Sequence, residues 1–286
     1  MLREISTVGF WHATRAQSWG LDWHRNEGIE LTYLSRGRLD FAVDGREHPL
    51  GAGHFTITRP WQQHRVGAPH VRASRLIWLI LDVGVRRPNQ EWRWPAWLIL
   101  KPEDLRELTR HLRHNENPVW KADAQIHHCF ERLVPLVTVS DPATVQTRLQ
   151  LLLNELFLSL LELLRSRQPP LDTNLSTSRR TVELFLAQLP DHLAHPWTLA
   201  EMAEQCGLGR TRFADYCRQL TNVAPMDHLT DCRIEAARAL LREQPARSIT
   251  DIGFECGFQS NQYFTTIFRH RTGFSPREFR KHNVVA

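Results

Sequence analysis

The C-terminal third of the chain contains the stretch TLAEMAEQCGL, residues 198–208, and the similar stretch SITDIGFECGF, residues 248–258. The two stretches align at an offset of 50 residues, 248 minus 198. Each has a glycine, Gly207 or Gly257, at a place where a helix must end and the chain must turn sharply. A second helix is expected after each glycine. The repeat therefore predicts two helix-turn-helix units.

The repeat also predicts how each unit begins and packs. Thr198 stands three residues before Glu201, and Ser248 three residues before Asp251, so each copy has the capping-box arrangement of a helix start. In each first helix an apolar residue is expected to face inward, and the small residue after it is expected to let the second helix approach. These positions are Met202 and Ala203 in the first copy and Ile252 and Gly253 in the second.

A long helix is predicted between the two units. Pro225 stands at a helix start, and MDHLTDCRIEAARALLRE, residues 226–243, keeps apolar residues at helical spacing. A helix of roughly 16–18 residues is about 25 Å long, which would hold two recognition helices at neighbouring turns of the major groove. A further helix before the first unit is expected to complete the core with Val182, Phe185, Leu186 and Leu189.

Helical spacing also predicts which side chains of the two second helices face away from the core. On the first of these helices they are Arg210, Thr211, Arg212, Ala214, Asp215 and Arg218. On the second they are Asn261, Gln262, Thr265, Thr266 and Arg269. These polar faces are expected to enter the major groove of double-stranded DNA.

The region from about residue 179 to residue 282 resembles the DNA-binding domain of the AraC/XylS family of transcription regulators. The stretch GFECGFQSNQYFTTIFRHRTGFSPREFR, residues 253–280, is very close to the second unit of that family. The resemblance implies a promoter-binding regulator, an activator with RNA polymerase as a further partner. It places the base-contacting positions on Thr211, Ala214, Asp215, Asn261, Gln262, Thr265 and Thr266. Arg218, Arg269 and Arg271 are expected to contact phosphates.

The first half of the chain reads as short strands separated by turns. The runs are IELTYLSRG, RLDFAVDGRE, HFTITRP and ASRLIWLILDV, between about Gly28 and Val83. The pair Asp44-Gly45, flanked by alternating apolar residues, predicts a hairpin. Several short strands at this spacing indicate a small antiparallel barrel or sandwich.

Three helices are predicted after Pro102, the third of them leucine-rich. The first has Leu105, Leu108 and Leu112 on one face, and the second covers residues 124–137. The third has Asp141 as its N-cap and Pro142 as its first residue, and it continues to about Arg167. It has two apolar stripes, one of Leu149, Leu152, Leu156 and Leu163 and one of Leu153, Phe157, Leu160 and Leu164. One stripe is expected to form a homodimer with the same helix of a second subunit; alternatively, both stripes pack inside one subunit.

The strand-rich region resembles the cupin-like effector domain of the same family. The likeness rests on His24, on GIELTYLSRG with Glu30 and Gly37, on GAGHFTITRP, and on His64 after Pro60. It implies a small-molecule effector held in the mouth of the barrel. Aromatic rings beside charged hydrogen-bonding groups suit a sugar ring or another polar metabolite. The candidate effector-binding residues are His24, Glu30, Thr32, Arg36, Arg38, Trp61, His64 and Trp78.

The alternative is a metal-dependent cupin enzyme with a DNA-tethering domain. His24, Glu30 and His64 have the residue types of a two-histidine, one-carboxylate metal site. The motif HRNEGIE lacks the second histidine of catalytic cupins, however, and regulators of the family generally bind their effector without a metal. We therefore expect no catalytic residues, no metal and no cofactor.

Composition sets the outer bounds of the interpretation. A chain of 286 residues with 42% hydrophobic residues suits two domains, here 1–165 for the effector and dimerisation domain and 179–286 for the DNA-binding domain, with a linker at 166–178. The fold class is α+β: a cupin-like β-barrel with a helical dimerisation segment, then an all-α domain. Five cysteines without a CxxC pair, no signal segment and no membrane-spanning run favour a cytoplasmic protein. Most of the net charge of +5 does not come from the second domain, because residues 181–286 hold 12 Lys+Arg and 12 Asp+Glu and only Arg179 and Arg180 add +2.

Overall fold

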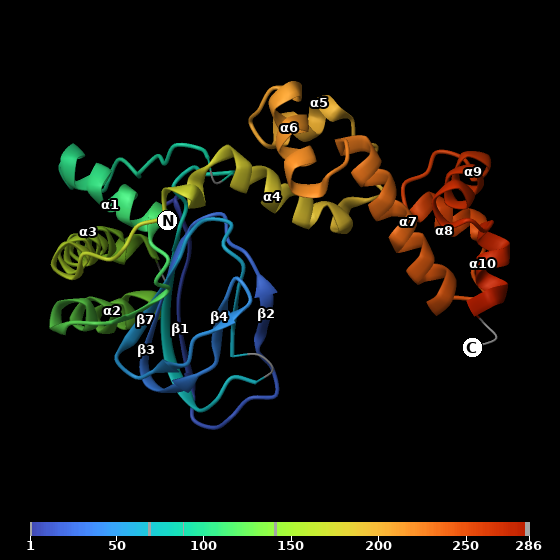
Figure 1. Cartoon of the computed structure of the whole chain (residues 1–286). Helices are drawn as coiled ribbons and strands as arrows, with labels where there is room; N and C mark the ends of the chain where they lie inside the picture. The colour runs from blue at the N-terminus through green and yellow to red at the C-terminus, as the bar shows by residue number, and fades with distance from the viewer. Residues whose placement is uncertain (1, 68–69, 88, 140–141, 284–286) are drawn as a thin grey trace. The chain divides into compact units, whose positions relative to one another are not determined.

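A computed structural model of the chain describes residues 2–67, 70–87, 89–139 and 142–283 (Figure 1). The chain divides into two compact units, Met1–Thr177 and Ser178–Ala286. The first contains every strand of the described residues, and the second is helical. None of the helices in the described ranges combines the length and the apolar character needed to cross a membrane.

The first unit is built on two antiparallel sheets. The larger sheet has the order β1 (Ile5–Ala13), β9 (Ser74–Leu81), β3 (Ile29–Leu39), β7 (His54–Thr58) and β10 (Val119–Lys121), and β6 (Leu50–Gly51) pairs with β3. The smaller sheet has the order β2 (Leu21–His24), β8 (His64–Val66), β4 (Phe41–Val43) and β5 (Arg46–Glu47). The expected antiparallel, cupin-like architecture is confirmed.

Strand β3 shows how the sheet separates core from cavity. Successive side chains of a strand point to opposite faces. Ile29, Leu31 and Tyr33 therefore join the core that the sheet shares with the helices. Glu30 and Thr32 point to the other face, into the space between the two sheets. The predicted hairpin is confirmed, since Asp44 and Gly45 have φ of 47° and 81° and join β4 to β5.

Three helices cover the outer face of the larger sheet (Figure 1). They are α1 (Pro102–His114), α2 (Ala124–Val137) and α3 (Pro142–Arg167). The proposed N-cap of α3, Asp141, lies outside the described residues.

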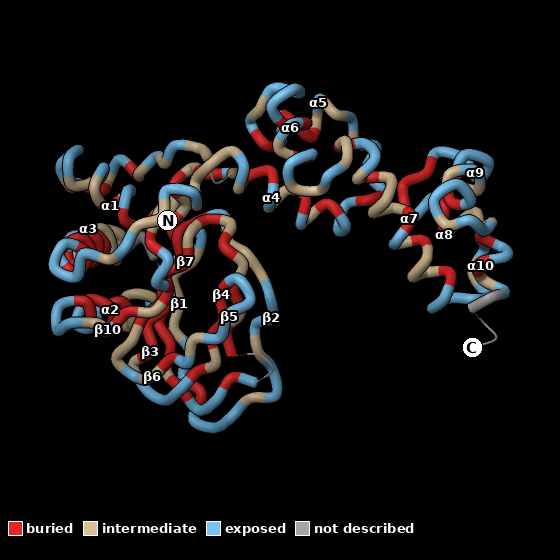
Figure 2. Tube along the Cα trace, viewed as in Figure 1, coloured by how far each residue is buried: buried red, intermediate tan, exposed pale blue. Residues whose placement is uncertain are grey.

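The idea that one apolar stripe of α3 is left for a second subunit is wrong. Leu152, Leu156 and Leu163 of the first stripe and all four residues of the second are buried in one core, and Leu149 packs against it (Figure 2). Both faces find partners inside the unit because α3 packs against α2 and α1 and meets tryptophans of the segment before α1, such as Trp94.

Part of the predicted linker, residues 166–178, is packed against the first unit. Leu171 forms a β-bridge with Asn115, and the amide of Asp172 donates to the carbonyl of His114 at 2.8 Å. The short 3-10 helix η1 (Thr173–Ser176) follows, and its Ser176 hydroxyl lies 2.9 Å from Nε2 of His114. These contacts hold the segment on the first unit up to the boundary after Thr177.

The second unit has two small cores joined by one helix. Its elements are α4 (Ser178–Gln188), η2 (Leu189–His192), α5 (Leu199–Gln205), α6 (Arg210–Thr221), α7 (Pro225–Glu243), α8 (Ile249–Glu255), α9 (Asn261–Thr272) and α10 (Pro276–Asn283). Helix α7 contributes Leu229 to the core around α5 and α6, and Ile234, Ala237 and Leu241 to the core around α8 and α9. The two predicted helix-turn-helix units and the connecting helix are confirmed.

The helix starts differ between the two copies. Thr198 and Glu201 form the expected capping box, but the side chain of Ser248 makes no cap hydrogen bond, so the second predicted capping box is wrong. Ser248 has φ −58° and ψ 134°, outside the extended conformation in which Thr198 reaches its partner. The small residue of the second copy acts as expected, since a Cβ on Gly253 would lie 2.8 Å from the ring of Phe264.

Candidate functional site

Helix α6 presents a polar face to solvent. Five of its six predicted groove residues are exposed: Arg210, Thr211, Arg212, Asp215 and Arg218. Ala214 is buried instead, because at 100° per residue it lies on the edge of the face that carries the buried residues Phe213 and Cys217. The charges of this face are partly paired, since the guanidinium of Arg218 lies 3.7 Å from the carboxylate of Asp215. The guanidinium of Arg212 lies 5.8 Å from the ring centroid of Tyr216.

Helix α9 presents a similar face with a different chemistry. Its start is capped by Ser260, whose hydroxyl accepts from the amide of Tyr263 at 3.2 Å. Asn261, Gln262, Thr266 and Arg269 are exposed as predicted, and Thr265 is half-buried. Tyr263, which is 52% exposed on the same helix, was not among the predicted DNA-contacting residues. It could have been found from the sequence because a large aromatic residue stands there at a position outside the apolar stripe of the helix.

Arg271 is placed differently from Arg269, the other arginine of α9. Its Nη2 lies 2.9 Å from Asp227 and its Nε lies 3.3 Å from Asp231, both on α7. The expectation that Arg271 faces a phosphate disagrees with this arrangement, because the side chain spans to α7 and ties the two helices together. Two acidic residues one turn apart on α7 give the guanidinium two partners at once.

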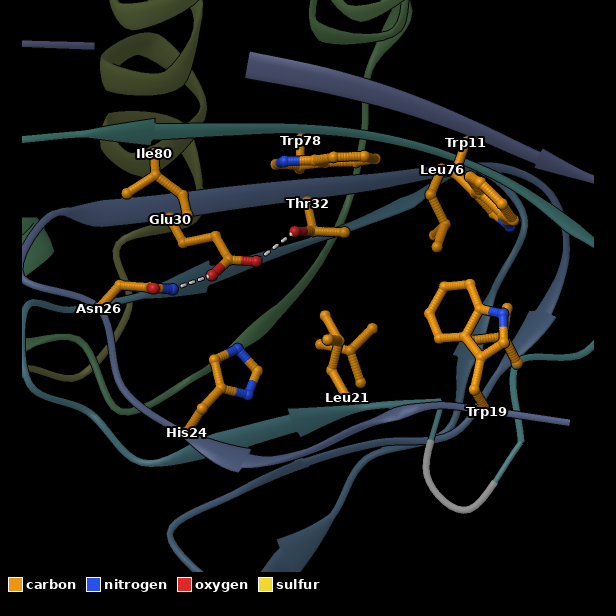
Figure 3. Close-up of a pocket in the computed structure, with 12 residues that line it drawn as sticks. Trp11, Trp19, Leu21, His24, Asn26, Glu30, Thr32, Leu76, Trp78 and Ile80 are labelled. Carbon is orange, nitrogen blue, oxygen red and sulfur yellow. Dashed lines mark hydrogen bonds between the residues drawn. The ribbon is translucent and has the colours of Figure 1, made fainter. Parts of the chain in front are cut away.

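A cavity of about 320 Å³ opens between the two sheets of the first unit (Figure 3). Four predicted effector-binding residues line it: His24, Glu30, Thr32 and Trp78. Eight further residues line it that were not predicted: Trp11, Trp19, Leu21, Asn26, Val66, Val71, Leu76 and Ile80. The polar side chains gather at one end, and Trp11 and Trp19 stand at the other (Figure 3). This volume is at the small end of the range for ligand-binding pockets.

The polar end of the cavity is organised around the buried carboxylate of Glu30. Its Oε1 accepts from the hydroxyl of Thr32 at 2.7 Å, and its Oε2 accepts from the amide of Asn26. The same Oε2 lies 3.0 Å from Nε2 of His64. Nδ1 of His64 donates to the carbonyl of Gln62 at 2.9 Å, so the imidazole can donate at both nitrogens only when it is protonated.

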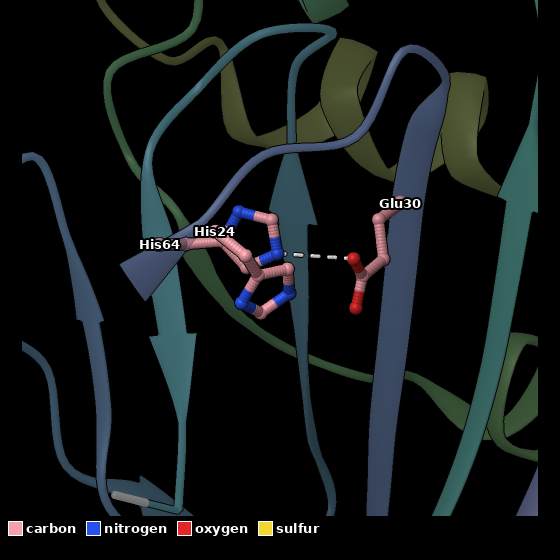
Figure 4. Close-up of side chains that lie close together, drawn as sticks. All are labelled: His24, Glu30 and His64. Carbon is pink, nitrogen blue, oxygen red and sulfur yellow. Dashed lines mark hydrogen bonds and ion pairs between the residues drawn. The ribbon is translucent and has the colours of Figure 1, made fainter. Parts of the chain in front are cut away.

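The pair of Glu30 and His64 is held in its charged form. Burial opposes both charges, but the hydrogen bond and the charge of the partner outweigh it. The pKa of the Glu30 carboxyl is therefore below its usual value, and the pKa of the His64 imidazole is above its usual value. His64 lies just behind the cavity wall, and its ring centroid is 4.3 Å from that of His24 (Figure 4).

Three predicted effector-binding residues lie away from the cavity lining. Arg36 and Arg38 are exposed, because a register shift between Leu34 and Arg36 ends the alternation that placed Glu30 and Thr32 inside. Trp61 has a left-handed backbone, with φ of 67°, and packs against the core on the helical side of the larger sheet.

His24, Glu30 and His64 also have the donor set of a metal site. One ligand atom from each lies within 4.8 Å of the other two (Figure 4). Nδ1 of His24 donates to the carbonyl of Asp22 at 2.7 Å, so both imidazoles are oriented by backbone carbonyls in the way that metal-binding histidines are. These residues fit an iron or manganese ion. The carboxylate at the same time already accepts from three donors of the protein, Asn26, Thr32 and His64.

Two family matches follow the division of the chain. Residues 202–282 match the helix-turn-helix domain family, and residues 12–80 match the cupin domain family. The first range contains both recognition helices, and the second contains most of the cavity lining.

Several curated proteins are similar to this chain. The HTH-type transcriptional activator RhaS of Escherichia coli O139:H28 is 39% identical over 126 residues, which are 44% of this chain and 44% of that protein. RhaS of Klebsiella pneumoniae (strain 342) is 26% identical over 260 residues, which are 90% of this chain and 87% of that protein. The aligned part of this chain thus spans less than half of the first of these relatives.

Two solved structures are also similar to parts or all of this chain. The DNA-binding domain of AdpA, in complex with a target DNA, is 26% identical, covers 36% of this chain and 93% of that chain, and has a TM-score of 0.35. Apo ToxT from Vibrio cholerae is 12% identical, covers 97% of this chain and 98% of that chain, and has a TM-score of 0.41.

Proposed function

The chain belongs to the AraC/XylS family of transcription regulators, and we propose that it binds promoter DNA through α6 and α9 under the control of a small molecule in its cupin-like unit. The observation that carries the proposal is the second unit itself. One helix, α7, belongs to both small cores, and each core presents a helix with an exposed polar face. The relatives that align with this chain are named transcriptional activators, which supports activation through RNA polymerase.

The two faces divide into residues that read bases and residues that hold the backbone. Asn261 and Gln262, at the start of α9, have the amide groups that pair with adenine, and Thr211 and Asp215 offer further contacts from α6. Arg269 suits a phosphate, where it adds affinity without sequence preference.

A footprint on the promoter beside its own gene tests the proposal. The full chain is expected to protect a defined sequence, and Asn261→Ala is expected to weaken that binding by about 1–3 kcal/mol. Gln244→Ala, at the exposed end of α7, is the matched control and should leave the footprint unchanged. The absence of any sequence-specific protection, with or without candidate effectors, would overturn the proposal.

A homodimer through α3 remains part of the proposal, although on a different face from the two buried stripes. Leu151 and Leu158 lie seven residues apart on this helix and are 62% and 42% exposed. Glu155 lies between them and pairs with Arg132 of α2. A seam of apolar residues seven apart suits pairing of two identical helices.

Sedimentation of the full chain tests the dimer. The double variant Leu151→Lys, Leu158→Lys is expected to sediment as a monomer where the parent chain sediments as a dimer. Ile99→Lys changes a residue of the same unit that is 77% exposed, and it should leave the dimer intact. A double variant that still dimerises would remove α3 from the interface.

The metal-dependent enzyme is a second candidate, favoured by the convergence of His24, Glu30 and His64. A metal held by these residues would supply Lewis-acid or redox chemistry at the polar end of the cavity. Metal analysis of the purified chain distinguishes the two functions. Stoichiometric iron or manganese, lost on chelation together with thermal stability, would support the enzyme; sub-stoichiometric metal and unchanged stability after chelation would support the regulator.

A further inference from the structure

We infer that the cavity of the first unit takes a small apolar ring compound that carries a hydrogen-bond donor, such as an aromatic alcohol or amine. The inference rests on the proposed function and names the chemical class of its effector. It comes from the division of the cavity into apolar walls and one polar end, and from the kind of hydrogen-bonding capacity left at that end.

The polar end of the cavity has hydrogen-bond acceptors that are not used by donors of the protein. A carboxylate offers about four acceptor positions, and Glu30 already accepts from Asn26, Thr32 and His64. One position remains, on the oxygen that faces Thr32. His24 places Nδ1 against the carbonyl of Asp22, and in the tautomer that donates there its Nε2 is an acceptor. A bound molecule meets these groups best with an O–H or an N–H.

The same groups disfavour an anionic ligand. A carboxylate at this end would stand beside the buried charge of Glu30, whose positive partner His64 is already engaged with it. Like charges in a buried site repel strongly, because little water is present to screen them. A hydroxyl or an ammonium group has no such conflict.

The walls indicate the rest of the molecule. Trp11, Trp19 and Trp78 line the cavity with indole rings, and Leu21, Leu76 and Ile80 add aliphatic side chains to the lining (Figure 3). Trp11 and Trp19 are 38% and 43% exposed, so a ligand against them would cover apolar surface. A sugar would bring several hydroxyl groups against walls that offer them no partner. This chemistry favours a ring with one polar group over the sugar that the sequence suggested.

Four small ring compounds test the inference on the full chain. Benzyl alcohol and benzylamine carry a donor, benzoate carries a carboxylate, and methyl glucoside carries several hydroxyls. Quenching of tryptophan fluorescence measures binding, because three tryptophans line the cavity. Each donor probe is expected to bind at least tenfold more tightly than benzoate and the glucoside. Tighter benzylamine than benzyl alcohol would assign an ammonium group, and the reverse order a neutral hydroxyl.

A variant and a control assign the selectivity to one residue. Glu30→Gln replaces one carboxylate oxygen by an amide NH2 donor and removes the negative charge. It is expected to reverse the order of affinities, so that benzoate binds more tightly than benzylamine. Glu47→Gln changes an exposed acid of β5 and should keep the order of the parent chain. If the circular dichroism shows that Glu30→Gln is unfolded, the order of affinities of the four probes for the parent chain still tests the inference.

The outcomes separate this inference from the proposed function. Equal or tighter binding of benzoate or the glucoside, or no binding of either donor probe at millimolar concentration, would overturn the inference. A promoter footprint made with the same preparation, both without a probe and with each probe, reports on DNA binding. An intact footprint beside the wrong order of probes therefore removes only the ligand class, whereas a missing footprint removes the proposed function.

Discussion

Arg269 and Arg271 lie two residues apart in the last turn of α9, and we expect that only the substitution of Arg269 changes the salt dependence of DNA binding. Across the described residues Arg269 makes no ion pair, whereas Arg271 pairs with Asp227 and Asp231 of α7. We expect Arg269 to neutralise a phosphate. Arg271 is expected to hold α9 against α7 and to take no part in the contact with DNA.

The expected magnitude follows from counterion release. Each neutralised phosphate adds about 0.9 to the slope of log affinity against log salt. Arg269→Gln should therefore lower the slope by about 0.9, which reduces the loss of affinity between about 50 and about 200 mM salt by about 3.5-fold. Arg271→Gln should leave the slope unchanged and lower the free energy of unfolding, by about 0.2–1 kcal/mol for each exposed ion pair lost.

Fluorescence anisotropy of the full chain on a promoter duplex, at several salt concentrations, measures both slopes. Urea denaturation of the same proteins measures the free energy of unfolding. If Arg271→Gln lowers the slope as much as Arg269→Gln does, the two ion pairs with α7 do not persist on DNA and the assignment is refuted.

Three further predictions test the fold and the cavity. Gly273→Ala should lower the free energy of unfolding by about 1–2 kcal/mol, because only the left-handed backbone, φ 82°, opposes a side chain there. Gly257→Ala, at φ 88°, should lower it clearly more, because its Cβ would lie 2.0 Å from a backbone carbonyl oxygen. Urea titration measures both. Gly9→Ala would place a Cβ 2.2 Å from the ring of Trp78, so it should weaken binding of benzyl alcohol while DNA affinity stays unchanged. The carboxylate of Glu30 raises the pKa of His64, so this contribution to stability is present below the ordinary histidine value of about 6.5 and is lost as pH rises through the raised pKa. His64→Gln should flatten the fall in thermal stability above about pH 6.5.

The helix-turn-helix units could be predicted in detail because their signals are local. Helix caps, apolar spacing and the glycine turns all act within a few residues, and the repeat supplied each signal twice. Helix α2 was predicted over the same range that the structure gives, residues 124–137. The failure at Ser248 shows the limit, since a correct residue type does not fix the backbone angles that a cap needs.

The cavity could be predicted only in part because its walls come from distant segments. Alternation along β3 placed Glu30 and Thr32 correctly, and Trp78 follows from the strand that pairs with it. Trp11 reaches the cavity because β1 pairs with β9, and Trp19 lies there with its carbonyl accepting from the amide of Val71 at 2.8 Å. No local pattern reports such long-range pairings.

The apolar pattern of α3 had a related limit. Periodicity reveals that a helix face is covered and does not reveal by what. Both leucine stripes are covered within one unit. The exposed residues Leu151 and Leu158 are only two, so they do not form a recognisable stripe in a helix so rich in leucine.

The balance of charge in the second unit bears on how it would read DNA. Asp215 pairs with Arg218, and both Asp227 and Asp231 pair with Arg271. Acidic residues therefore engage two of the three arginines that were expected to contact phosphates. The face of α9 that remains is mostly uncharged, with amide and hydroxyl groups near its start. Uncharged groups add little to counterion release and much to base selection. A regulator of this kind would bind its promoter more through contacts with particular bases than through neutralised phosphates. The net charge of the chain is for this reason a poor guide to this DNA-binding unit.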